Sequence, residues 1–175
     1  MNLESIFQKL QIQDMNQMQK STYTATENET DVILLSPTGS GKTLAFLFPL
    51  LRNLKKENTG IQAMILVPAR ELALQIEQVF KQMGTDFKVS ICYGGHDKKI
   101  EINNFREAPA VLIGTPGRIA YHLRNQNFDP TTIKTLVLDE FDKALELGFE
   151  EDMNEIIEAL ENNSQRILTS ATAMD

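Results

Sequence analysis

The sequence predicts an α/β fold built on a mainly parallel sheet with helices on both faces. Short apolar runs rich in β-branched residues recur along the 175 residues, and each is nearly continuous, as is typical of strands buried on both faces. Helical patterns lie between most of these runs, and such alternation favours parallel pairing. The length suits one domain, 1–175, with a sizeable core. The predicted strands are 32–35, 63–67, 89–93, 110–114, 135–139 and 166–170.

The helical patterns have recognisable ends. The stretch up to about residue 30 predicts two helical pieces that precede the alternation. Pro49 indicates a kink or a frayed end in the helix that follows the first strand. Gly84 supplies a stop after a run with apolar residues at helical spacing. The predicted helices span 41–56, 70–84, 117–125 and 149–163.

Composition predicts a soluble globular protein, with 42% hydrophobic and 23% charged residues. Cys92 is the single cysteine, so no internal disulfide can form and nothing requires an oxidising compartment. The N-terminus carries Glu4 and lacks the long apolar core of a secretory signal. The most apolar window, "LAFLFPLL", is too short to span a bilayer. We therefore expect a cytoplasmic location and no membrane association.

The charge is unevenly distributed. Net charge is −7, which argues against strong attraction to nucleic acid. Residues 42–124 nevertheless hold twelve Lys or Arg against seven Asp or Glu, whereas 139–161 hold ten acids against one base. We interpret the acidic block as a solvated helix face. Contacts between the middle of the chain and phosphates would be local and modest.

The stretch "LLSPTGSGKT", residues 34–43, resembles a phosphate loop. The usual pattern is glycine, four residues, then Gly-Lys-Thr or Gly-Lys-Ser, and here Ser36 takes the first position. A small residue is needed there, and serine is small. The segment follows a predicted strand and opens a predicted helix, which is the context that the motif requires. The sequence therefore predicts a nucleotide site formed by Ser36, Pro37, Thr38, Gly39, Ser40, Gly41, Lys42 and Thr43.

Each residue type suits a phosphate. The helix N-terminus offers unpaired N–H groups and partial positive charge. Gly39 and Gly41 can adopt backbone angles closed to other residues. Lys42 would bridge the terminal phosphates, each charge-assisted hydrogen bond contributing roughly 1.5–3 kcal/mol. Thr43 would place its hydroxyl on Mg²⁺.

Carboxylates end a second apolar strand in "TLVLDEFD". Asp139 would hold Mg²⁺, and the adjacent Glu140 would orient or deprotonate the attacking water. The other interpretation is an acidic loop at a helix start, where carboxylates favour the dipole. Together with the phosphate loop, the functional interpretation is the stronger one.

These motifs together resemble those of the DEAD-box RNA helicases of superfamily 2. They fall in the family's order across nearly the whole chain, and six motifs in order are specific where one is weak. The matching segments are "SPTGSGKT" (motif I), "PAREL" at 68–72 (motif Ia), Gly94-Gly95, "TPGR" at 115–118 (motif Ib), "DEFD" (motif II) and "SAT" at 170–172 (motif III).

The resemblance implies a RecA-like phosphate-loop NTPase domain. It further implies an enzyme that uses ATP and Mg²⁺, binds single-stranded RNA or a short duplex by its backbone, and works with a second RecA-like domain in cis, which these residues do not include. We expect a monomer. The implied catalytic residues are Lys42, Asp139 and Glu140, with Thr43 and Asp139 on the metal and Gln19 at the adenine.

Two more sets of residues receive roles through the same resemblance. The implied RNA-backbone contacts are Pro68, Arg70, Gly94, Gly95, Thr115, Gly117 and Arg118. The residues implied to couple hydrolysis to strand separation are Asp142, Ser170 and Thr172. Without the resemblance, Arg70 would be interpreted as a surface arginine and "TPGR" as an ordinary helix start.

The sequence departs from the family pattern at three positions. The family's adenine-reading Q motif carries glycine and proline ahead of its glutamine, and aligning Gln19 puts Gln11 and Met15 at those positions. The stacking aromatic of that motif would precede Met1, and Phe7 is expected to pack a helix instead. Phe141 replaces the usual alanine of motif II, which we interpret as a change of side-chain size without a change of role.

Other functions remain open at this point. A non-catalytic switch that binds ATP, RNA or a protein partner would keep the same motifs. A small-molecule kinase is less favoured, because the loops carry the motifs described above where a lid and a substrate pocket would be needed. His96 and His122 have no Cys or carboxylate partner at metal-ligand spacing and are interpreted as ordinary polar residues.

Overall fold

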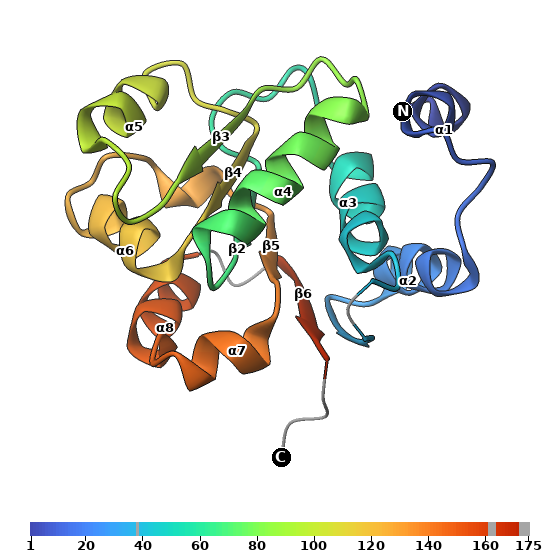
Figure 1. Ribbon diagram of the computed structural model, residues 1–175. Helices are drawn as coiled ribbons and strands as arrows, with labels where there is room; N and C mark the ends of the chain where they lie inside the picture. The colour runs from blue at the N-terminus through green and yellow to red at the C-terminus, as the bar shows by residue number, and fades with distance from the viewer. Residues whose placement is uncertain (38, 161–163, 172–175) are drawn as a thin grey trace.

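In this computed structural model, which describes residues 1–37, 39–160 and 164–171, six strands form one parallel sheet (Figure 1). Their order across the sheet is β1-β6-β5-β2-β4-β3, so β1 and β3 are the edges. The prediction of a parallel sheet is confirmed. The strands are β1 (Asp31–Leu35), β2 (Ala63–Leu66), β3 (Val89–Cys92), β4 (Val111–Gly114), β5 (Thr135–Leu138) and β6 (Gln165–Ser170).

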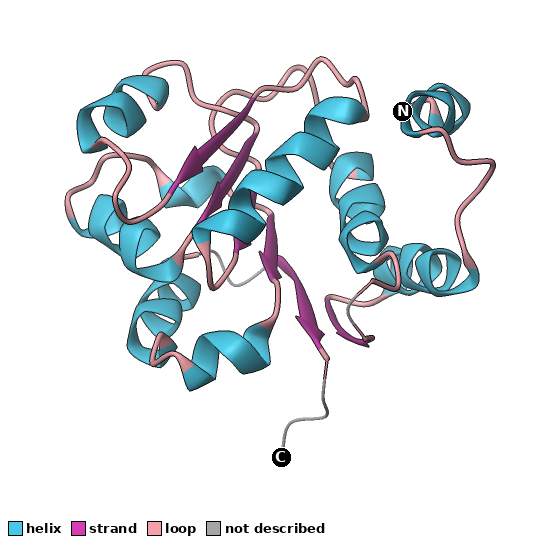
Figure 2. Ribbon diagram, in the orientation of Figure 1, coloured by secondary structure: helices cyan, strands magenta, loops and turns pink. Residues whose placement is uncertain are grey.

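Helices cover both faces of the sheet (Figure 2). Those that precede β3 in the chain lie on one side, and those that follow it lie on the other (Figure 1). The helices are α1 (Leu3–Leu10), α2 (Gln17–Asn28), α3 (Lys42–Arg52), α4 (Arg70–Gln82), α5 (Lys98–Asn104), α6 (Pro116–Arg124), α7 (Phe141–Glu146) and α8 (Glu150–Ala159), with a 3₁₀ turn at Pro130–Thr132.

The strand residues contribute side chains to two apolar cores, one on each face of the sheet. In β2, Ala63 and Ile65 join the core under α1, α3 and α4, while Met64 and Leu66 join the core under α6, α7 and α8. Successive side chains of a strand point to opposite faces, so a doubly covered strand must be apolar at every position. This is why the strands could be predicted from continuous apolar runs.

The helix after β1 ends earlier than predicted. It runs past the buried Pro49 to Arg52, so Pro49 is interior, and the expected extension to residue 56 is wrong. The backbone of Lys55 pairs instead with the Gln62 side chain, whose Oε1 accepts from Lys55 N–H at 2.9 Å and whose Nε2 donates to Lys55 O at 2.8 Å. The Gln62 side-chain amide thus replaces the helical hydrogen bonds at Lys55.

The N-terminal segment forms two helices, as predicted. Phe7 of α1 packs its ring edge-on against Phe48 of α3 at 5.8 Å between centroids, which confirms its expected packing role. Met15, between α1 and α2, is buried in the same core. The described helices include none that is both long enough and apolar enough to cross a membrane.

Two short helices, α5 and α7, were not predicted. The acidic block contributes to α7 and α8, and α8 buries Met153 and Ile156 while exposing Glu150, Glu151 and Glu158. That arrangement confirms the solvated acidic helix face.

Candidate functional site

The phosphate loop joins β1 to α3 at the carboxyl edge of the sheet. Gly39 and Gly41 have φ of 85° and 87°, the left-handed region that favours glycine. A Cβ on Gly41 would also lie 2.7 Å from Gln19 Nε2, so a side chain here would displace that amide in addition to straining the backbone. Gly41 is the N-cap of α3 and provides no side-chain cap, which leaves the first-turn N–H groups of α3 available to an anion.

The N-terminus of α2 braces this loop. Asn16 Nδ2 donates to Ser40 O at 3.1 Å, and Gln19 Nε2 donates to Gly41 O at 3.0 Å. Gln19 Oε1 accepts from Asn16 N–H at 2.9 Å, which closes a capping box on α2. Gln19 therefore lies beside the phosphate loop and holds it in place, while its implied role at the adenine stays a prediction. This bracing role was not predicted.

The serine that opens the loop is also engaged. Ser36 is buried, and its hydroxyl contacts the Ser40 hydroxyl, which in turn donates to Pro37 O at 2.7 Å. Ser36 N–H donates to Ser170 O of β6 at 3.1 Å. The position thus uses its hydroxyl inside the loop, whereas the sequence predicted only a need for small size. Thr38 lies outside the described residues.

Lys42 faces the two carboxylates of the second strand. Its Nζ lies 3.9 Å from Asp139 Oδ1 and 3.9 Å from Glu140 Oε1, and its side chain is 9% exposed. Among the described residues, Nζ has no hydrogen-bond partner. A buried ammonium group at this separation from two carboxylates retains its donors for a further anion.

Asp139 is held by its neighbours and lies 2% exposed. Its Oδ1 accepts from the Thr169 hydroxyl and from Glu140 N–H at 3.1 Å, and Glu140 N–H is also shared with Thr169 Oγ1 at 3.0 Å. Burial raises the pKa of the Asp139 carboxyl, and the Thr169 hydrogen bond and the charge of Lys42 offset only part of that rise.

Thr169 was missed at the sequence level. The sequence signal was a hydroxyl directly after the apolar pair Ile167-Leu168 and one residue before the motif III match, and the structure buries it fully. Glu140 takes a left-handed conformation at φ 50°, which begins α7 and directs the chain away from the strand. Asp142 lies in the first turn of α7 and Ser170 ends β6, while Thr172 lies outside the described residues.

The implied RNA contacts gather at the other half of the same edge. Six of the seven line one cavity of about 540 Å³: Pro68, Arg70, Gly94, Thr115, Gly117 and Arg118. They follow β2, β3 and β4, whose carboxyl ends are adjacent in the sheet. Gly95 is next to Gly94 in the chain but is not part of the lining.

The cavity also has walls that the sequence did not indicate. Lys98 of α5 lies over the ring of Tyr121 of α6, with its Nζ 4.1 Å from the centroid, and both line the cavity. Phe149 closes another side. An exposed cation and an aromatic ring in one groove suit a nucleic-acid backbone and its bases.

Behind this cavity lies a buried carboxylate, Glu101 of α5, which the sequence also did not indicate. Its two oxygens contact His96, Arg118 and His122 at 2.7–2.8 Å. His122 is fully buried, so its interpretation as an ordinary polar residue is wrong. His96 likewise belongs to this cluster.

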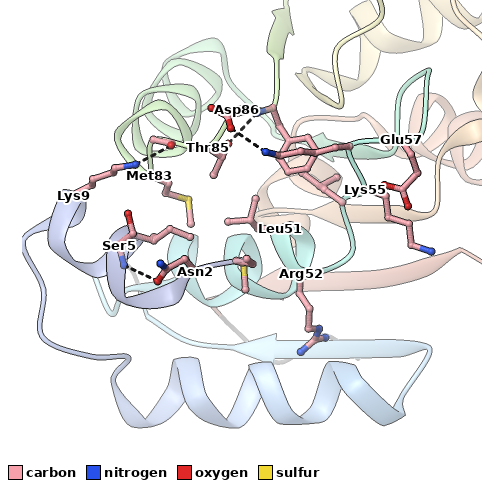
Figure 3. A pocket seen from close by; sticks show the side chains of 16 residues that line it. Asn2, Ser5, Lys9, Leu51, Arg52, Lys55, Glu57, Met83, Thr85 and Asp86 are labelled. Atoms are coloured by element: carbon pink, nitrogen blue, oxygen red, sulfur yellow. Dashed lines mark hydrogen bonds and ion pairs between the residues drawn. The ribbon is translucent and has the colours of Figure 1, made fainter.

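A separate cavity of about 600 Å³ lies between α1, the end of α3 and the turn after α4 (Figure 3). Its charged groups are largely satisfied: Lys9 donates to Gly84 O at 3.1 Å, and Lys56 pairs with Asp86 at 3.0 Å. None of the predicted site residues lines it.

A strand–loop–helix phosphate site with carboxylates two strands away in the sheet defines a phosphate-loop NTPase domain of the RecA-like kind. The family model for DEAD/DEAH box helicases matches residues 16–175. The chain belongs to the DEAD/DEAH box helicase family.

Relatives agree with that assignment. The ATP-dependent RNA helicase CshA of Limosilactobacillus reuteri is 40% identical over 157 residues, 89% of this chain and 32% of that protein. The ATP-dependent rRNA helicase RRP3 of Encephalitozoon cuniculi is 37% identical over 161 residues, 91% of this chain and 40% of that protein. The chain thus spans less than half the length of these two relatives.

A solved structure confirms the fold. The crystal structure of a DEAD box protein from the hyperthermophile Methanococcus jannaschii superposes with a TM-score of 0.90 at 31% identity, covering 98% of this chain and 47% of that one.

Proposed function

We propose that this chain is the ATP-binding domain of an RNA helicase, which couples ATP binding and hydrolysis to RNA binding and local strand separation when joined to a second RecA-like domain. The observation that carries the proposal is the buried Lys42 ammonium, 3.9 Å from each of two carboxylates and without a hydrogen-bond partner among the described residues. Such a group has donors left for a further anion, and the uncapped start of α3 offers N–H groups to the same ligand.

The residues present suit MgATP. Phosphate oxygens would accept from Lys42 and from the α3 N–H groups, and the Thr43 hydroxyl and the Asp139 carboxylate are hard oxygen donors of the kind that Mg²⁺ prefers. Bound Mg²⁺ would neutralise charge on the phosphates. Glu140, which is partly exposed, would orient or deprotonate the attacking water. Gln19 would meet the adenine from its position beside the loop.

RNA would bind at the other half of the edge. Gly94, Thr115 and Gly117 line this cavity and offer backbone groups to it, and Arg70 and Lys98 add positive charge. Such contacts hold phosphates and sugars without selecting bases. Asp139 N–H donates to Leu66 O at 2.9 Å, so the strand that ends in the nucleotide carboxylates is bonded directly to the strand that leads to the RNA cavity. Asp142, Ser170 and Thr172 would carry the coupling between the two.

The test is nucleotide binding by calorimetry. Lys42→Ala should weaken MgADP and MgATP binding by about tenfold or more, because the loop loses its only cation. The matched control is Lys81→Ala on the exposed face of α4, which should bind as the parent does. Equal affinity of Lys42→Ala and the parent would refute the site.

A further inference from the structure

Glu101 is a carboxylate buried at the junction of α5, α6 and the loop after β3. The residue is 1% exposed, and its side chain is fully enclosed. Its oxygens face four donors. Oε1 contacts Arg118 Nη1 at 2.8 Å and His122 Nε2 at 2.8 Å, and Oε2 contacts Tyr93 N at 3.0 Å and His96 Nδ1 at 2.7 Å.

The carboxylate is kept charged by these contacts. Burial by itself would raise its pKa, but the hydrogen bonds from His122, His96, Arg118 and the Tyr93 N–H outweigh burial and lower the pKa. Arg118 is the one permanent cation in the cluster, and its side chain is only 9% exposed. Loss of the carboxylate would leave that guanidinium buried and without its counter-charge.

The contacts fix two walls of the RNA cavity relative to each other. Arg118 Nη1 also donates to His96 O at 2.9 Å, so the guanidinium is held between α5 and the loop. Tyr93 N–H and the His96 ring lie on either side of Gly94-Gly95, so one carboxylate anchors both ends of the glycine pair. Gly94 and Arg118 both line the cavity, whereas Glu101 does not.

We propose that Glu101 is a positioning residue for RNA: it holds Arg118 and the Gly94-Gly95 loop in the geometry that receives the RNA backbone, without touching RNA itself. This inference rests on the proposed function. Glu101, a buried residue of α5, would thus support the part of the proposed RNA cavity that follows β3 and β4.

An amide cannot replace the carboxylate. In Glu101→Gln one oxygen becomes an NH₂ group, which can donate but not accept. His96 can present an acceptor nitrogen by changing tautomer, whereas the other ring nitrogen of His122 lies 2.9 Å from Asn127 Nδ2. The Arg118 guanidinium and the Tyr93 N–H can only donate. Whichever way the amide turns, one of these two donors faces another donor. The substitution therefore disturbs either the arginine or the loop while conserving shape.

The experiment measures binding of a fluorescein-labelled single-stranded oligouridine by anisotropy, together with MgADP affinity and a thermal melt. We expect Glu101→Gln to weaken oligouridine binding by about five- to tenfold and to leave MgADP affinity within about twofold, since the nucleotide loop lies at the other half of the edge. Glu107→Gln, the same chemical change at an exposed position, should bind as the parent does.

A double-mutant cycle separates positioning from general destabilisation. The Arg118 guanidinium is the charged group that Glu101 holds, so most of the effect of Glu101 on RNA binding should pass through it. Adding Glu101→Gln to Arg118→Ala should therefore weaken binding by no more than about twofold beyond Arg118→Ala alone. Losses that multiply would overturn the proposal, as would unchanged binding by Glu101→Gln. If Glu101→Gln does not fold, Glu101→Asp provides the test: it keeps the charge but is one methylene shorter and cannot reach all four donors, so parental affinity would overturn the proposal.

The outcomes also distinguish this inference from the function on which it rests. A parent chain that does not bind oligouridine, or that binds it equally well after Arg118→Ala, contradicts the RNA assignment and the positioning role together. A parent that binds and an Arg118→Ala variant that does not, with Glu101→Gln unaffected, contradicts the positioning role alone.

Discussion

At the scale of single residues, Asp139 shows a conflict between stability and function. The carboxylate is buried where Mg²⁺ would need it ionised, and no described cation lies closer to it than Lys42 at 3.9 Å. Its pKa in the folded chain is raised above the ordinary value of 3.8, chiefly by burial. The folded state therefore binds the proton more tightly than the unfolded chain does.

The stability that Asp139 gives the folded chain should therefore fall as the pH rises. The contribution of Asp139 to stability is fully present below pH 3.8 and is lost as the pH rises through the raised pKa. We expect Asp139→Asn, which cannot ionise, to gain stability relative to the parent over that interval in nucleotide-free protein. Urea denaturation of both proteins at a series of pH values measures the difference, and a constant difference across the series would contradict it.

The partner of Asp139 gives a second prediction. Thr169 donates to the carboxylate and accepts from Glu140 N–H, so Thr169→Val removes both interactions while keeping the shape. We expect the free energy of unfolding to fall by roughly 1–3 kcal/mol, because buried polar groups lose partners. Affinity for MgADP should fall as well, since Asp139 is no longer oriented. Thr169→Ser keeps the hydroxyl and should behave nearly as the parent in both measurements.

At the scale of secondary-structure elements, the backbone of Gln11 at the end of α1 is strained. The sequence indicated a departure from the family pattern at this position but not the strain. Gln11 ends α1 with φ 60°, at the position where the resembled Q motif has glycine. A non-glycine residue in the left-handed region costs roughly 1–2 kcal/mol. A left-handed residue therefore occupies a position where the resembled motif has glycine, the residue that adopts this region most readily.

This cost predicts the effect of restoring glycine. Gln11→Gly should raise the free energy of unfolding by about 0.5–1 kcal/mol, the relief of strain being partly offset by the greater freedom of glycine in the unfolded chain. Gln8→Gly, inside α1 and with helical φ, should instead lower it. Thermal or urea unfolding distinguishes the two, and destabilisation by Gln11→Gly would show that the side chain contributes more than the strain costs.

The elements differ in how far sequence predicts them. The strands and the longer helices follow from periodic apolar burial, which is local in the chain. The helices α5 and α7 have seven and six residues, too few to show a clear amphipathic repeat. Most of the residues proposed to bind nucleotide could be identified from the sequence because the phosphate loop is one continuous segment. The Glu101 cluster could not be, because its members come from α5, α6 and the β3 loop and meet only through the fold.

At the scale of the whole molecule, the carboxyl edge of the sheet is divided into two halves. The strands β1, β6 and β5 end at the residues proposed to bind nucleotide, and β2, β4 and β3 end at the cavity proposed to bind RNA. The halves meet where β5 pairs with β2, with Leu66 opposite Leu138. In the proposed enzyme, a shift of Asp139 and Glu140 would reach the proposed RNA cavity most directly through this pair of hydrogen-bonded strands.

The open nucleotide half of the edge determines how fast this chain alone should hydrolyse ATP. The chain holds Lys42, Asp139 and Glu140 on one open edge, with Glu140 partly exposed to solvent. Only groups that bind the transition state more tightly than the ground state accelerate chemistry. In the proposed two-domain enzyme, arginines of the second RecA-like domain would supply such groups, and contributions of this kind reach about 10³–10⁵ in rate. The 175-residue chain should therefore bind ATP but hydrolyse it very slowly, without stimulation by RNA.

Joining a second RecA-like domain in cis should restore RNA-stimulated hydrolysis, measured as phosphate release with and without oligouridine. Glu140→Gln in the joined protein should abolish hydrolysis and spare ATP binding, because the amide cannot accept the proton of the attacking water. Glu146→Gln, at the far end of α7, is the matched control and should hydrolyse ATP as the parent does. Robust RNA-stimulated hydrolysis by the 175-residue chain would contradict the need for a second domain. An inactive joined protein with Glu140 intact would instead favour the non-catalytic switch, in which ATP binding alone changes the RNA-facing half of the edge.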